Sequence, residues 1–192
     1  MCLEGGSKDG RFFGESPTLI LGLQLHLGTC VYETVIYLIY KEKRIEMYIH
    51  HVLVIVNYGV CLLTGEMMFY SAWAGIVEGT NCFLAPLVLM QRFDCPERPL
   101  KKYLLYKLNG LLLWLSFLIL RVTSLICLLL SLWQDAREES ELHYQRVMLP
   151  WRVGGVVTCV LLLLISSFWF VKITQGMLKG LGFFQPKKMR VA

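Results

Sequence analysis

Charged residues are scarce in this chain of 192 residues, at 17% of the total, whereas about a quarter of a typical soluble domain is charged. Hydrophobic residues make up 56%, and the mean hydropathy is +0.55. They gather in blocks of about 20 residues, the length that a helix needs to cross a hydrocarbon core of roughly 30 Å. This composition argues against a soluble enzyme, and the length allows one helical bundle rather than several domains.

Several motifs are absent as well. The seven cysteines are scattered, mostly inside apolar stretches, with no Cys-x-x-Cys pair, which favours buried or lipid-facing thiols over a disulfide framework. No pattern predicts a cofactor or a bound metal, and no Asn-x-Ser/Thr site is present. The first sixteen residues contain no apolar run of the kind found in a cleaved signal peptide, so we expect insertion to begin with the first membrane helix.

The net charge of +5 does not indicate a nucleic-acid partner. Such a partner would require Lys and Arg gathered on a soluble surface, and here they lie between the apolar blocks. They are typical of loops that set the orientation of a membrane protein.

Five apolar segments predict an all-α, polytopic transmembrane bundle of about five helices. Two long runs, 125–132 and 156–165, have no polar face, whereas a helix on the surface of a soluble protein has one. The predicted organisation is a polar N-terminal segment over 1–16, a transmembrane domain over 17–175 and a basic tail over 176–192. The five segments are 17–40, 48–64, 67–91, 103–133 and 151–174.

The basic residues predict which ends of the helices face the cytoplasm, because cytoplasmic loops are enriched in Lys and Arg. With five crossings, the three basic connections lie on one side of the membrane, and the mixed loop 134–150 lies on the other. We therefore expect the N-terminus outside or in the lumen and the C-terminus in the cytoplasm. The basic residues are Lys41, Lys43 and Arg44 in the first loop, Arg92, Arg98, Lys101 and Lys102 in the third, and Lys179, Lys187, Lys188 and Arg190 in the tail.

Four polar residues stand out within the apolar segments in addition to a His pair, and residues of this kind normally face the bundle interior because a charge in the bilayer is costly. Glu78 and Arg121 lie near the middle of their segments, which predicts that they pair. Asn81 is three residues from Glu78 and so on nearly the same helix face. Glu33 lies nearer the cytoplasmic end, at a depth that matches the His pair. The alternative is a packing clasp without chemistry.

The His pair, His50 and His51, is a candidate general base, since the unperturbed pKa of histidine lies near neutrality. Adjacent residues point about 100° apart on a helix, so we expect only one of the two to face a given site. A plain interfacial role is the alternative. His26 shows no partner pattern. Pro86 is expected to kink the third segment, so that Glu78 and Asn81 line a cavity or, alternatively, so that packing is adjusted.

The order of these residues resembles the TLC-domain family, which includes the translocating-chain-associated protein, the ceramide synthases and small TLC-domain proteins. The resemblance rests on Tyr32-Glu33, His50-His51, Glu78, Asn81 followed by Pro86-Leu87, and Arg121 in a leucine-rich helix. It departs from the ceramide synthases, which carry an acidic stretch where this chain has Leu84-Ala85-Pro86-Leu87. The family usually has a further helix at the front, so the resemblance implies a truncated or alternatively spliced form.

The resemblance implies a multi-pass protein of the endoplasmic reticulum or plasma membrane that acts in lipid homeostasis, handling, sensing or modifying phospholipid or sphingolipid acyl chains. Glu33, Glu78, Asn81 and Arg121 would line its lipid pocket. One alternative is an acyl-CoA-dependent N-acyltransferase like the ceramide synthases, with His50 or His51 as general base. Another is a membrane adaptor without catalysis. The expected partners are membrane lipids and, for the acyltransferase, acyl-CoA.

Overall fold

The computed structural model describes residues 8–14, 16–93, 104–138 and 149–180, and in these ranges the chain forms helices and no strands. Five of the helices are long and apolar enough to cross a membrane. The fold is therefore the all-α transmembrane bundle that the apolar segments predict. Much of the third loop and of the tail, including Arg98, Lys101, Lys102, Lys187, Lys188 and Arg190, lies outside the described residues.

The first two spans are α2 (Pro17–Ile39) and α3 (Ile45–Thr64), preceded by a short helix, α1 (Lys8–Phe13). Pro17 occupies the first turn of α2, where a missing backbone N–H costs nothing. Gly65 ends α3 with φ of 74°, a left-handed conformation that glycine adopts without strain. Short connections of this kind force α2, α3 and the next span to run antiparallel to one another.

The third and fourth spans each contain a segment that is not α-helical. The third consists of α4 (Met68–Gly75), the 3₁₀ segment η1 (Ile76–Thr80) and α5 (Asn81–Arg92). The fourth consists of α6 (Leu104–Ser116), the π-helical segment η3 (Phe117–Thr123) and α7 (Ser124–Glu138). The change of helix type in the third span precedes Pro86, and α5 runs without a break through that proline.

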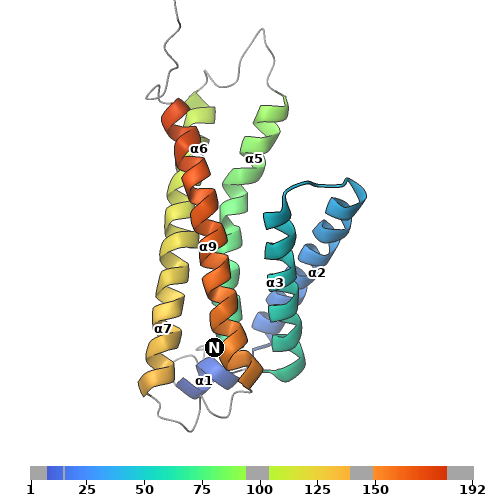
Figure 1. The fold of residues 1–192 in the computed structure, drawn as a ribbon, viewed down its shortest axis with the longest axis vertical. Coiled ribbons are helices and arrows are strands. Elements are labelled where there is room, and N and C mark those ends of the chain that lie inside the picture. Colours follow the sequence, from blue (N-terminus) through green and yellow to red (C-terminus); the bar gives the residue numbers. More distant parts are fainter. Residues whose placement is uncertain (1–7, 15, 94–103, 139–148, 181–192) are drawn as a thin grey trace, which may run out of the picture.

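The fifth span, α9 (Leu149–Gly180), begins before and ends after the segment predicted from sequence. In Figure 1 it runs alongside α6 and α7, while α2 and α3 form a hairpin on one side of the bundle. The α2–α3 connection, the end of α5, the start of α6 and the end of α9 all lie at the upper end. We call this the basic end, because the described basic residues of these helix ends and of the α2–α3 connection belong to it, namely Lys41, Lys43, Arg44, Arg92 and Lys179. The opposite end carries α1, and we call it the α1 end.

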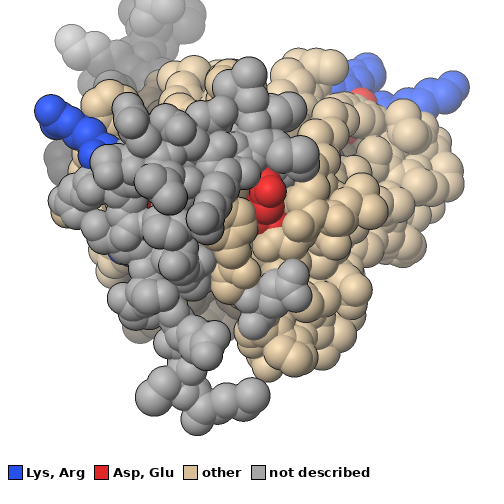
Figure 2. Space-filling model, turned by 90° about the horizontal axis from the view of Figure 1, so that it is seen from below, with Lys and Arg blue, Asp and Glu red and all other residues tan. Residues whose placement is uncertain are grey.

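The outward faces of the spans are apolar, as lipid contact requires. Exposed leucines occur on all five spans, with Leu25 at 65%, Leu63 at 86%, Leu89 at 58%, Leu130 at 62% and Leu164 at 61% exposure. Seen from the α1 end in Figure 2, the described surface carries few charged side chains. Most of the buried apolar side chains form one core that includes residues from α1, α2, α3, α4, α7 and α9.

Candidate functional site

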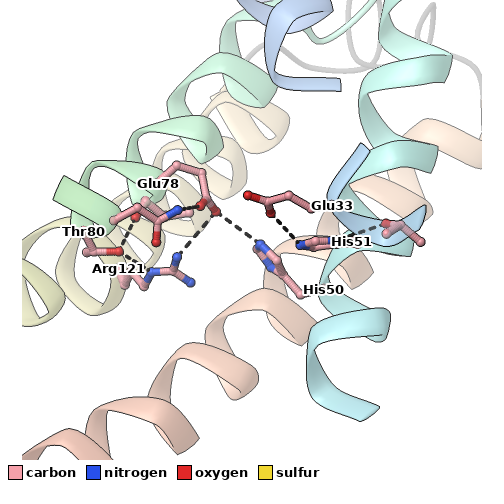
Figure 3. Close-up of polar contacts among 9 residues, drawn as sticks. Glu33, His50, His51, Glu78, Thr80 and Arg121 are labelled. Carbon is pink, nitrogen blue, oxygen red and sulfur yellow. Dashed lines mark hydrogen bonds and ion pairs between the residues drawn. The ribbon is translucent and has the colours of Figure 1, made fainter. Parts of the chain in front are cut away.

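Glu78 is the centre of a polar cluster between the third span and its neighbours (Figure 3). Its Oε1 lies 3.2 Å from His50 Nε2 and 3.4 Å from Arg121 Nη2. Its Oε2 accepts a hydrogen bond of 2.7 Å from Asn81 Nδ2. A carboxylate that receives donors on both oxygens is held in its ionised form and in one orientation.

Arg121 is held on the other side of the cluster by a hydroxyl and two rings. Its Nε donates to Thr80 Oγ1 at 3.0 Å, and Thr80 in turn donates to the Val77 carbonyl. The guanidinium carbon lies 4.9 Å from the ring centre of Phe117 and 5.3 Å from that of Trp169. These contacts supply the cation–π attraction and hydrogen bonding that a buried guanidinium needs.

The two ionic residues lie on the two non-α segments of the bundle. Glu78 is in η1 and Arg121 is in η3, and these segments pack against each other. Local 3₁₀ and π turns change the angular position of a side chain and recur at functional sites. We infer that the irregular turns are what aims the carboxylate and the guanidinium at each other.

His51 makes a second set of polar contacts, with Glu33 and Thr34 on α2. Its Nε2 lies 3.4 Å from Glu33 Oε2, and its Nδ1 lies 2.9 Å from Thr34 Oγ1. The Thr34 hydroxyl donates its single hydrogen to the Cys30 carbonyl at 2.6 Å, so its oxygen must accept from His51 Nδ1–H. The contact between His51 Nε2 and Glu33 then requires one further proton, held by one of these two groups.

His50 has the opposite arrangement of its ring nitrogens. Because Glu78 is an acceptor, the proton of neutral His50 is on Nε2, and Nδ1 carries the lone pair. Within the described part of the chain, His50 Nδ1 is buried and has no hydrogen-bond partner. A histidine with one nitrogen oriented by a carboxylate and the other free has the arrangement of a general base.

A small cavity lies beside His50 and Glu78, with a volume of about 10 Å³, roughly the room needed for one water molecule. Asn57, Tyr58 and His26 also line it. The ring of His26 meets that of Tyr58 edge-on at 5.0 Å. Val54, Ala74, Val77, Thr158 and Leu162 complete the lining, so the cavity has a mostly apolar surface with a few polar side chains at its wall.

The cluster reaches the side of the bundle as well as its interior. The side chain of Glu33 is 43% exposed and that of Glu78 is 22% exposed, and Asn81 is exposed. His50 and His51, by contrast, are 4% and 2% exposed. A molecule that approaches through the lipid would meet the amide and carboxylates first and the histidines behind them.

The expected pair of Glu78 and Arg121 is present, and Glu33 contacts one member of the His pair. The structure differs in the second histidine, because His50 faces Glu78 instead of Glu33. The rings of His50 and His51 have their centres 5.7 Å apart, so the Glu78–Arg121 pair and the Glu33–His51 pair lie next to each other. Catalysis by the histidines and lipid binding by Glu33, Glu78, Asn81 and Arg121 stay predictions.

Four contributors were missed by sequence reasoning. Thr80 is fully buried. Its position between the predicted residues Glu78 and Asn81 could have identified it from the sequence. Trp169 lies within the leucine-rich fifth span, and such a ring beside an intramembrane Arg is a recognisable cation–π partner. Thr34 adjoins Glu33. His26 showed no partner pattern along the chain, and only the folded α2 brings it to the cavity.

Outside the spans, the loop at the basic end contains a well-formed ion pair. Arg44 Nε and Nη2 donate to Glu42 Oε1 and Oε2 at 3.0 and 3.1 Å. These side-chain hydrogen bonds, with those from the backbone N–H groups of Arg44 and Lys43, lower the pKa of Glu42 to about 2. The same pairing raises the pKa of Arg44. The pair is at the surface, so its energy is screened by solvent.

In the described ranges, no group of three or more His, Cys, Asp or Glu side chains is placed to hold a metal ion. Comparison with known proteins identifies one family. Its model, described as "TLC domain", matches residues 5–175. Neither the curated proteins nor the solved structures include a match to this chain.

Proposed function

The chain belongs to the TLC-domain family, and from this premise we propose that it acts in lipid homeostasis by handling, sensing or modifying the acyl chains of phospholipids or sphingolipids. The proposal is supported most directly by the position of the polar cluster. It lies within membrane-spanning helices, and Glu33 and Asn81 are exposed on the side of the bundle. Polar side chains at that depth would hydrogen-bond the polar group of a lipid that enters sideways.

The buried part of the cluster supports the second half of the proposal, the modification of a lipid. A free His50 Nδ1, oriented through Nε2 by Glu78, can accept a proton from a substrate. For an amine and an acyl-CoA, the amine nitrogen attacks the thioester carbonyl, the C–N bond forms and the C–S bond breaks. His50 takes the amine proton and returns it to the leaving thiolate. This is the acyl-CoA-dependent N-acyltransferase candidate.

A membrane adaptor without catalysis is the third candidate. In that case Glu78 and Arg121 would fix the register of the third and fourth spans. It is favoured by the number of contacts that Arg121 makes to Thr80, Phe117 and Trp169, all of which would serve packing equally well.

A photoactivatable phospholipid and a photoactivatable sphingolipid, each with the reactive group on the acyl chain, would test the lipid proposal. With the protein in nanodiscs, we expect cross-links to concentrate on α2 and α5 near Glu33 and Asn81. Glu78→Gln should weaken this concentration, and Lys41→Gln, in the loop after α2, should leave it unchanged. Cross-links spread evenly over the lipid-facing surface in all three proteins would contradict lipid handling at this site.

An activity assay separates the acyltransferase from simple lipid handling. Purified protein in lipid is given acyl-CoA and a long-chain base, and the N-acyl product is measured. The acyltransferase candidate predicts product above the level of a His50→Ala control. Product at the control level, with normal cross-linking, would leave lipid handling as the function.

The proposed membrane is the endoplasmic reticulum or the plasma membrane, with the basic end in the cytoplasm. This orientation follows from the Lys and Arg residues of the loops at that end. Protease protection of tags placed at the two termini would test it. A C-terminal tag that is protected in intact cells and cleaved once the plasma membrane is permeabilised with digitonin supports the orientation. A C-terminal tag that is cleaved in intact cells, or that stays protected after digitonin, contradicts it.

A further inference from the structure

The short helix α1 closes the α1 end of the bundle through its Phe12 side chain. Phe12 is 1% exposed and belongs to the main apolar core. Its ring lies 5.6 Å from that of Tyr70 on α4, and its carbonyl accepts a hydrogen bond of 2.7 Å from the Met67 N–H. Met67 has φ of 61°, a left-handed conformation that a residue other than glycine rarely adopts and that neighbouring contacts must hold.

A polar group ties α1 to the fourth span. Arg11 Nη2 lies 2.9 Å from Asp135 Oδ1, and the Tyr70 hydroxyl donates to Asp135 Oδ2. Asp135 is buried, at 3% exposure. One carboxylate near the end of α7 thus receives a cation from α1 and a hydroxyl from α4. Arg11 Nε is buried without a hydrogen-bond partner among the described residues, and this lost hydrogen bond makes the packing of α1 on the bundle less favourable.

A second cavity, with a volume of about 20 Å³, adjoins the residues of α4 that α1 packs against. Met67 and Tyr70, which Phe12 of α1 contacts, form part of its wall, and Cys159 forms another part. Asn57, Ala74, Thr158 and Leu162 line both this cavity and the one beside His50 and Glu78. A path opened at the α1 end would therefore lead toward the polar cluster.

The stability of α1 depends on these contacts. It has six residues, far fewer than the roughly 12–15 that an isolated helix needs to be even marginally stable in water. Elements with few buried contacts are the ones that open locally while the rest of a protein stays folded. Loss of the Arg11–Asp135 contact would leave α1 anchored mainly by Phe12.

From this geometry we propose that α1 is a releasable strap that closes the cavity at the α1 end and controls the entry of water and small polar molecules to the bundle interior. Release separates Arg11 from Asp135 and withdraws Phe12 from Tyr70, without unfolding of the five spans. The inference rests on these contacts alone and does not depend on the lipid proposal.

The labelling rate of Cys159 tests the strap, because this thiol lines the cavity at the α1 end and is 8% exposed. The full chain in nanodiscs is treated with a small charged methanethiosulfonate, and peptide mass mapping follows each thiol separately. We expect Arg11→Gln to raise the Cys159 rate about tenfold, as for the loss of a hydrogen-bonded charge pair. Arg11→Lys should stay close to the native rate. Cys30, buried in α2, reports opening of the whole bundle.

The strap is overturned if Cys159 labels at the native rate in a folded Arg11→Gln protein. It is also overturned if Cys159 and Cys30 accelerate together, since α1 would then be part of one cooperative core. Phe12→Leu keeps an apolar side chain in the same place and applies the same test if Arg11→Gln does not fold. A selective rise at Cys159 in that variant supports the strap, and no rise contradicts it.

Discussion

Arg121 Nη2 lies 3.4 Å from Glu78 Oε1, and each of these residues is on a turn that departs from the α-helix, Arg121 on the π segment and Glu78 on the 3₁₀ segment. The irregular turns explain how two residues in the interiors of separate spans face each other. The contact also places the ionised carboxylate where it can orient His50.

The pair predicts a non-additive effect on stability. Arg121→Met should lower the free energy of unfolding by about 3 kcal/mol, because it leaves Glu78 with an uncompensated charge in a mostly buried site. The double variant Glu78→Gln with Arg121→Met should recover part of this loss, since no charge remains. Unfolding in mixed detergent micelles measures both. Equal losses in the single Arg121→Met variant and the double variant would contradict the pair.

The two histidines should be found in opposite tautomers when neutral. His50 carries its proton on Nε2 because Glu78 accepts from that nitrogen, and His51 carries its proton on Nδ1 because Thr34 accepts there. Nitrogen NMR of ¹⁵N-histidine-labelled protein distinguishes the two forms. Glu78→Gln should change only the His50 signals, and Thr34→Val only those of His51. The same tautomer in both rings would contradict this arrangement.

Gly75 should not tolerate a side chain. A Cβ built there would lie 2.6 Å from the Tyr58 hydroxyl oxygen, and Tyr58 is 2% exposed, so it has little room to move. Gly75→Ala is expected to destabilise the protein by about 1–3 kcal/mol through overpacking. Gly59→Ala, where a Cβ meets nothing within 4 Å, is the matched control.

Adding Tyr58→Phe to Gly75→Ala should restore part of the lost stability, because it removes the atom that clashes. Thermal unfolding in one detergent compares the three variants. A double variant that is less stable than Gly75→Ala alone would show that the close approach is not the cause.

The loop at the basic end predicts a pH effect with a defined sign. The folded pKa of Glu42, about 2, lies below its ordinary value of 4.5, so the ion pair with Arg44 contributes stability above pH 4.5 that is lost as the pH falls toward 2. Carbon NMR of the Glu42 carboxyl measures the midpoint. Arg44→Gln should move it up toward the ordinary value, and a midpoint that does not move would contradict the pairing.

The spans were predictable because the lipid solvent imposes length and apolarity on every crossing. Depth along the helices was also enough to match Glu78 with Arg121. The depth of a residue in the membrane does not determine the direction in which its side chain points around the helix axis, however, so the partner of each histidine was not predictable. Which partner each histidine meets depends on the 3₁₀ and π turns. No sequence pattern indicates these turns, and they occur where η1 and η3 pack against each other.

The α1 helix was unpredictable for a different reason. Lys8–Phe13 is short and polar on average, so its periodicity carries no signal. Its helical state depends on Phe12 and Arg11 finding Tyr70 and Asp135, which are 58 and more residues away along the chain. Contacts between such distant residues come only from the folded bundle.

The lipid profile of cells that lack the protein, restored with either the native chain or Glu78→Gln, tests the central claim most directly. The Glu78 carboxylate contacts His50, Arg121 and Asn81, so Glu78→Gln should weaken all three contacts of the cluster. At matched protein levels in the membrane, we expect the native chain to restore the phospholipid or sphingolipid acyl-chain profile and Glu78→Gln to fail. Equal restoration by both proteins, or no change of the profile on removal of the protein, would contradict a lipid function of this cluster.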